Sequence, residues 1–121
     1  MNEKQFRFED LDVWKKGAAL SGPLFSMADD LEKRRLYRFA EQLRAATLSI
    51  TNNIAEGSGS VSKLDFANFL NTARRSVFEV ANMLFILAKD RYLDPTTVQS
   101  IIPQLEEESR MLLAFIRKLK S

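Results

Sequence analysis

The chain has 121 residues, a net charge of +2 and a hydrophobic fraction of 45%, which are values typical of one globular domain. It contains no cysteine and no histidine, which excludes disulfides, Cys/His zinc sites, thiol nucleophiles and histidine acid–base catalysis. No apolar run approaches the roughly 20 residues that a membrane-spanning helix needs, and the polar N-terminus does not resemble a signal peptide. We therefore expect one cytoplasmic domain over residues 1–121, with no metal, no cofactor and no membrane contact.

Apolar residues recur at helical spacing in four segments, and the chain has only four glycines and three prolines to interrupt them. The first helix is expected at about 9–29, with Pro23 bending it. The residues expected on its buried face are Leu11, Trp14, Ala18, Ser21, Phe25 and Ala28. The second helix is expected at about 34–57. It should end at Gly57, because glycine readily adopts the left-handed conformation that terminates many helices.

The third helix is expected at about 62–89, opened by Ser62 with Asp65 three residues later, a spacing similar to a capping box. The fourth is expected at about 95–119, with Asp94 as its N-cap and Pro95 at its first position. Short loops between long helices favour antiparallel neighbours. The pattern therefore predicts an all-α fold, an up-down-up-down antiparallel four-helix bundle.

The second and third helices carry more apolar surface than the core of a monomeric bundle requires. Extra apolar positions follow one flank of each helix, and we expect both flanks to turn to the same side of the molecule. Small residues also line the back of the second helix. These features are consistent either with a wide core or with a subunit interface. The residues of the predicted oligomer interface are Tyr37, Ala45, Leu48, Ser49, Asn52, Phe78 and Phe85.

Asn52 and Asn53 are unusual inside a helix, because asparagine is a poor helix former. In a hairpin of the second and third helices, Asn53 would face Asn68 and Gln42 would face Glu79. This arrangement favours a structural hydrogen-bond network over a ligand site. The remaining alternative is that both asparagines are exposed and simply tolerated in the helix.

Residues 40–57 (AEQLRAATLSITNNIAEG) resemble the signature of the 23S ribosomal RNA intervening sequence proteins. Three shorter pieces are also similar to that family: LDVW at 11–14, DFANFL at 65–70 and ARRSVFE at 73–79. The chain departs from the family pattern in three places, one of which is the atypical Pro23. Residues 27–35 lack the Pro- and Gly-containing link usual between the first two helices, and Arg75 stands where the family often has glycine.

The resemblance implies a bacterial four-helix bundle that assembles into a closed ring of five subunits. Similar proteins act as accessory subunits of the reverse transcriptases of diversity-generating retroelements, where a basic surface contacts nucleic acid and the enzyme. The family has no assigned catalytic residues, so the resemblance implies none here.

The acidic and basic residues are unevenly distributed, because residues 1–32 are net acidic and residues 33–60 are net basic. Four cations gather at the start of the expected second helix, where the helix dipole disfavours positive charge. Their partner could be the acidic stretch of residues 29–32 or a phosphate. A second basic pair lies midway along the third helix. The residues of the predicted nucleic-acid-binding surface are Lys33, Arg34, Arg35, Arg38, Arg74 and Arg75.

These observations favour a non-enzymatic homo-oligomer, most simply a homopentamer, that binds RNA or DNA through a basic surface without sequence specificity. The alternative is a ring-shaped scaffold or accessory subunit for a protein partner, with no direct contact to nucleic acid. No paired-carboxylate motif of the kind that holds a di-iron centre is present.

Overall fold

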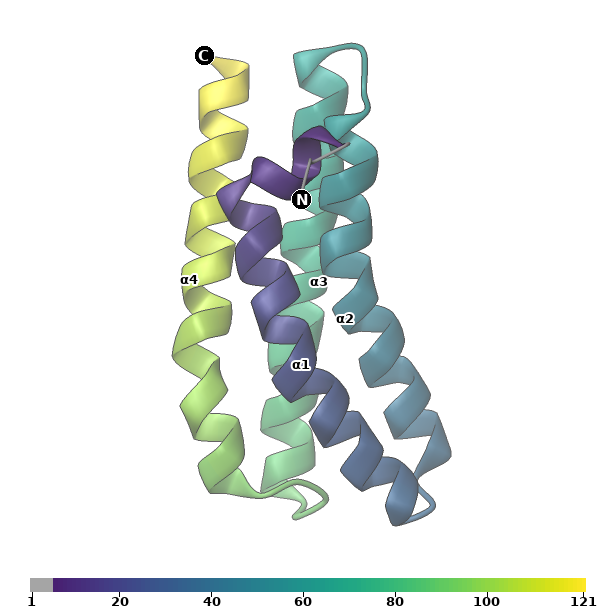
Figure 1. The fold of residues 1–121 in the computed structure, drawn as a ribbon. Helices are drawn as coiled ribbons and strands as arrows, with labels where there is room; N and C mark the ends of the chain where they lie inside the picture. The colour runs from purple at the N-terminus through teal and green to yellow at the C-terminus, as the bar shows by residue number, and fades with distance from the viewer. Residues whose placement is uncertain (1–5) are drawn as a thin grey trace, which may run out of the picture.

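The computed structural model describes residues 6–121, and in that range it contains four α-helices, one short 3-10 helix and no strand. The elements are η1 (Arg7–Asp10), α1 (Asp12–Lys33), α2 (Tyr37–Ser58), α3 (Lys63–Lys89) and α4 (Pro95–Lys120) (Figure 1). Each helix packs against the next one along the chain, and α1 makes a smaller contact with α4. The expected all-α class with four helices is confirmed.

The connections between helices gather at the two ends of the molecule. Figure 1 shows the α1–α2 and α3–α4 turns at one end, and the α2–α3 loop near the C-terminus at the other. The expected caps are present at two of the helices. The Ser62 hydroxyl accepts a hydrogen bond from the Asp65 amide (3.0 Å), and the Asp94 carboxylate accepts one from the Thr96 amide (3.2 Å).

The buried face of α1 differs from the one expected. The residues that α1 buries are Val13, Gly17, Leu20, Leu24, Met27, Ala28 and Leu31. Of the expected face, only Ala28 is fully buried, and the others lie half-buried on the flank. The reason is Gly17, where a Cβ would lie only 3.0 Å from the Thr51 Cγ2 atom of α2. A buried stripe that includes Gly17 lets α1 lie close to α2. Helical periodicity alone does not select this stripe over the one expected.

The helix boundaries at the α1–α2 turn also differ from those expected. Helix α1 continues through Pro23, as expected, but it ends at Lys33 rather than near residue 29, and α2 begins at Tyr37 rather than near residue 34. At the other end of α2, Gly57 lies inside the helix, and no glycine in residues 6–121 has a positive φ. The expected left-handed glycine cap is therefore wrong.

Gly57 instead permits close contact between α2 and α3. A Cβ atom at this position would lie 2.6 Å from Phe69 Cβ and 2.8 Å from Phe66 Cδ1. Phe69 Cβ is anchored to its backbone and cannot move aside cheaply, so any side chain here pushes the two helices apart.

We expect Gly57→Ala to lower the free energy of unfolding by about 1–3 kcal/mol, the range typical of overpacking in a dense core. Gly59→Ala is the matched control, because the nearest atom to its Cβ would be Glu56 O at an ordinary 3.5 Å. The control should change the free energy of unfolding by less than about 0.5 kcal/mol. Urea denaturation measures both, and equal effects would contradict the close-contact role of Gly57.

Candidate functional site

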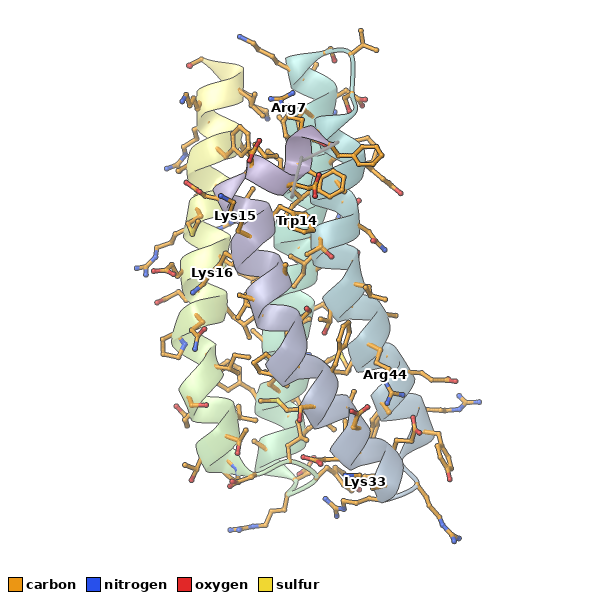
Figure 2. The ribbon with its side chains drawn as sticks, in the orientation of Figure 1. Arg7, Trp14, Lys15, Lys16, Lys33 and Arg44 are labelled. Atoms are coloured by element: carbon orange, nitrogen blue, oxygen red, sulfur yellow. The ribbon has the colours of Figure 1, made fainter. Side chains whose placement is uncertain are left out.

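Four of the predicted nucleic-acid-binding residues form a basic cluster: Lys33, Arg34, Arg35 and Arg38. The cluster lies at the end of the bundle that holds the α1–α2 and α3–α4 turns (Figures 1 and 2). Because α1 ends at Lys33, the residues Lys33, Arg34 and Arg35 sit at a helix C-terminus, where the dipole favours positive charge. Only Arg38 lies in the first turn of α2. The expectation that all four cations oppose a helix dipole is therefore wrong, and it holds for Arg38 alone.

Arg34 has a structural role within this cluster. Its Nη1 atom donates hydrogen bonds to the carbonyl oxygens of Tyr92 (2.7 Å) and Arg91 (3.2 Å) in the α3–α4 turn. Its guanidinium carbon also lies 5.7 Å from the centroid of the Tyr92 ring, within range of a cation–π interaction. Arg34 thus ties the end of α1 to the turn that follows α3.

The acidic stretch before the cluster has a different partner. Arg44 of α2 donates hydrogen bonds to Asp29 Oδ1 (2.7 Å) and Glu32 Oε1 (2.6 Å), and Figure 2 shows Arg44 reaching toward α1. The hydrogen bond to Asp29, followed by the one to Glu32, raises the pKa of Arg44. Of the two candidate partners for the basic cluster, the acidic stretch is therefore not supported at Asp29 and Glu32, which bind Arg44 instead.

Three cations of the cluster consequently remain available. Lys33, Arg35 and Arg38 are exposed, and none of them forms an ion pair within the described part of the chain. Positive charge without an intrachain carboxylate is what a phosphate-binding surface requires.

Arg74 and Arg75 do not join this cluster. They lie more than three turns before the end of α3, about 20 Å along the helix axis from its last residue. Arg74 Nε donates a hydrogen bond to the Ser109 carbonyl oxygen (3.1 Å), and its guanidinium stacks 5.0 Å from the Phe78 ring centroid. Arg75 is exposed. The structure therefore divides the predicted nucleic-acid-binding residues between two places.

The apolar strips are also separated. Phe78 and Phe85 are 56% and 48% exposed and line an apolar groove of about 370 Å³ between α3 and α4, with Ile102 and Pro103 on its far wall. Arg44 of α2 bonds to Asp29 of α1, so its face of α2 is turned toward α1. Leu48 lies one helical turn after Arg44 on that same face, away from the α3–α4 groove. The expectation that both strips turn to the same side is wrong.

A polar network joins α2 and α3, with partners that differ from those expected. Asn53 Nδ2 donates hydrogen bonds to the carbonyl (2.8 Å) and hydroxyl (3.0 Å) oxygens of Ser49, and the Ser49 and Ser76 hydroxyls lie 2.8 Å apart. Asn53 prefers Ser49 over Asn68 because an asparagine can bond to the turn below it in its own helix. Ser49 is thus engaged inside the subunit, whereas Ala45 and Asn52 on the same helix are exposed.

The comparison with protein families identifies what this bundle is related to. A family model described as 23S rRNA-intervening sequence protein matches residues 9–114. The chain belongs to this family. The match covers α1, α2, α3 and most of α4, so it applies to the whole bundle. Comparison with curated proteins gives no match.

Residues 6–121 contain neither a cluster of metal-ligating side chains nor a membrane-spanning helix. Among residues 6–121 there is no group of three or more acidic, histidine or cysteine side chains placed to hold a metal ion. No helix in the same range combines the length and the apolar character that crossing a bilayer demands.

Glu108 is a buried carboxyl that the sequence reasoning missed. It lies on α4 with 0% exposure, and neither carboxylate oxygen has a hydrogen-bond partner within the described residues. A Cβ at Gly17 would lie 3.1 Å from Glu108 Oε2, so the carboxyl faces α1 where the two helices meet. The sequence does carry a signal for this burial, because Glu108 falls on the same helical stripe as Leu105 and Leu112.

Burial raises the pKa of Glu108 from 4.5 to about 8. Lys16 on α1 opposes this rise and Glu107 adds to it, and these two residues pair with each other at 2.9 Å. The folded state therefore holds a proton that the unfolded state releases between the two pKa values. The contribution of this proton to the stability of the folded state is complete below pH 4.5 and is lost as the pH rises through about 8.

We expect the free energy of unfolding to fall by several kcal/mol between pH 5 and pH 9, at up to about 1.4 kcal/mol per pH unit. Glu108→Gln keeps the shape of the side chain and removes the titration, so it should flatten this dependence and stabilise the protein at high pH. Glu79→Gln, at an exposed carboxyl on α3, is the control and should retain the slope. Urea denaturation at a series of pH values measures it, and a flat wild-type profile would contradict the assignment.

Proposed function

We propose that this up-down-up-down antiparallel bundle is the non-enzymatic subunit of a cytoplasmic homo-oligomeric ring, most simply a pentamer, that binds RNA or DNA without sequence specificity. The observation that carries the proposal is the free positive charge of Lys33, Arg35 and Arg38 at one end of the bundle, while Arg44 engages the neighbouring acids. Guanidinium and ammonium groups displace the counterions of a phosphate backbone, which supplies affinity that does not depend on base sequence.

Assembly would strengthen this binding. Each subunit contributes one copy of the basic end, so a ring presents the same cations repeatedly to one long polyanion. Arg75, exposed midway along α3, would contact a second stretch of the same nucleic acid. Arg74 would act there mainly through its contacts with Ser109 and Phe78.

Self-association is supported by the exposed aromatic and aliphatic side chains. Phe78, Phe85, Tyr37 and Leu48 each expose close to half or more of their surface in the isolated subunit. Exposed apolar patches, such as the groove that Phe78 and Phe85 line, mark interaction sites in soluble proteins. Two separate apolar edges on one subunit suit a ring, because a head-to-tail interface joins two different surfaces of the same chain.

A second candidate function is a scaffold or accessory subunit for a protein partner. The apolar groove between α3 and α4 favours it, because a groove of this size accepts side chains of another protein. In this alternative the basic end would not contact nucleic acid.

Light scattering on the wild-type protein should give a mass several times the subunit mass of 13.9 kDa. Phe78→Ala and Phe85→Ala should reduce that mass while the helical circular dichroism persists, since both rings are largely exposed in the subunit. Phe6→Ala removes another exposed ring, 62% accessible, and serves as the matched control. A wild-type mass of one subunit would refute the ring.

Titration of labelled duplex DNA and structured RNA should show binding that weakens steeply with salt and varies little with sequence. The triple variant Lys33→Gln, Arg35→Gln, Arg38→Gln should lower both the affinity and the salt slope, because each lost phosphate contact reduces the slope by about one. Arg117→Gln, Lys118→Gln, Lys120→Gln removes the same charge from the other end of the bundle. If the protein binds neither duplex DNA nor structured RNA at low salt, only the scaffold function remains.

A further inference from the structure

Two arginines adopt a backbone conformation that usually belongs to glycine. Arg35 has φ 64° and Arg91 has φ 62°, and within residues 6–121 they are the only residues other than glycine with a positive φ. In this left-handed region the Cβ of an L-residue crowds the following carbonyl oxygen. A non-glycine residue there is uncommon, and a long side chain is rarer than the asparagine or aspartate that tolerate it best.

Both arginines occupy the same position in the same kind of turn. At the end of α1, the Leu36 amide donates to the Leu31 carbonyl (2.9 Å) and the Arg35 amide to the Glu32 carbonyl (2.8 Å). These two bonds form a Schellman motif, in which the residue just beyond the helix is left-handed and is usually glycine.

The end of α3 repeats this pattern. The Tyr92 amide donates to the Leu87 carbonyl (2.8 Å) and the Arg91 amide to the Ala88 carbonyl (3.1 Å). The chain has glycines elsewhere, none of them with a positive φ, and it places arginine at both turns where glycine would be less strained. Strain retained at two equivalent positions indicates that the side chain matters there.

The two turns are held together by Arg34. Its bonds to the carbonyl oxygens of Arg91 and Tyr92 link the end of α1 directly to the α3–α4 turn, so the two left-handed arginines stand on adjoining turns at one end of the bundle. Both are exposed, and neither forms an ion pair in the described range.

Three carboxylates near these turns are engaged by other groups. Asp29 and Glu32 bind Arg44, and Asp94 accepts hydrogen bonds from Thr96 and Thr97 at the start of α4. Asp90 makes a long contact of 3.7 Å with Lys89. The two arginines therefore keep their positive charge available to a ligand.

We infer that Arg35 and Arg91 form a two-armed clamp for phosphates of a nucleic-acid backbone, with Arg34 as the positioning residue that joins the arms. This inference rests on the proposed nucleic-acid binding and assigns it a site that includes Arg91. A guanidinium offers a planar fork of donors that matches phosphate oxygens in pairs, which an ammonium cannot do. The fork explains why arginine, rather than lysine, stands at both turns.

The test is the double variant Arg35→Gly, Arg91→Gly in the full-length chain. Glycine relieves the left-handed backbone, so the melting temperature should rise or stay level, while the affinity for a labelled DNA duplex at low salt should fall at least tenfold. The second variant, Arg35→Lys with Arg91→Lys, retains the charge without the fork and should bind with intermediate affinity. Arg117→Gln with Lys118→Gln removes two charges at the opposite end and should bind like the wild type.

The outcomes separate the clamp from the proposed function. If wild type binds neither duplex DNA nor structured RNA at low salt, both are overturned. If wild type binds and the double glycine variant binds equally well, the clamp is overturned and the proposed function stands. A lower melting temperature together with weaker binding would show that the arginines support the fold, which also overturns the clamp. Lysine variants that bind like wild type would overturn the role of the guanidinium fork.

Discussion

Helix α1 ends where the chain turns left-handed at Arg35, and the arrangement of the basic end depends on that turn. The turn places Lys33 and Arg34 at a helix C-terminus, where their charge is favourable. It also directs Arg34 to the carbonyl oxygens of the α3–α4 turn, which joins two loops that are distant in the sequence. Arg34 thereby holds together the two turns that carry the basic end.

The bundle combines two different kinds of contact between helices. Gly17 and Gly57 allow α1 and α3 to approach α2 closely, so the seams on either side of α2 are dense. The contact of α1 with α4 is smaller, and it is there that the neutral Glu108 carboxyl lies buried without a hydrogen-bond partner in the described residues. A buried polar group without a partner destabilises a core, and a raised pKa limits the penalty by keeping the group uncharged. Glu108 consequently links the stability of the bundle to pH.

The charged and the apolar parts of the bundle surface lie apart. Arg44 neutralises the acids beside the basic end and so leaves that end positive, while Phe78 and Phe85 open an apolar groove on a different side. The hydrogen bonds among Ser49, Ser76 and Asn53 join α2 to α3. The basic end and the apolar groove are therefore separate surfaces of the bundle.

The sequence by itself determined the features that depend on neighbouring residues. Helical periodicity predicted four helices, the caps at Ser62 and Asp94 were read from their spacing, and residues 40–57 indicated the family. Each of these signals is local, because a cap or a helical face involves residues within about four positions of one another.

Only the tertiary structure decided the features that depend on which helices meet. Helix α1 has two apolar stripes, and the contact of Gly17 with α2 selects between them. The left-handed conformation of Arg35 runs against local preference, so no sequence rule places the end of α1 at Lys33. The partners of Arg34, Arg44 and Glu108 lie on other helices, and the distances between helices are set by packing of the whole core. Local pattern therefore specifies the elements, while long-range packing specifies which charges are paired, buried or free.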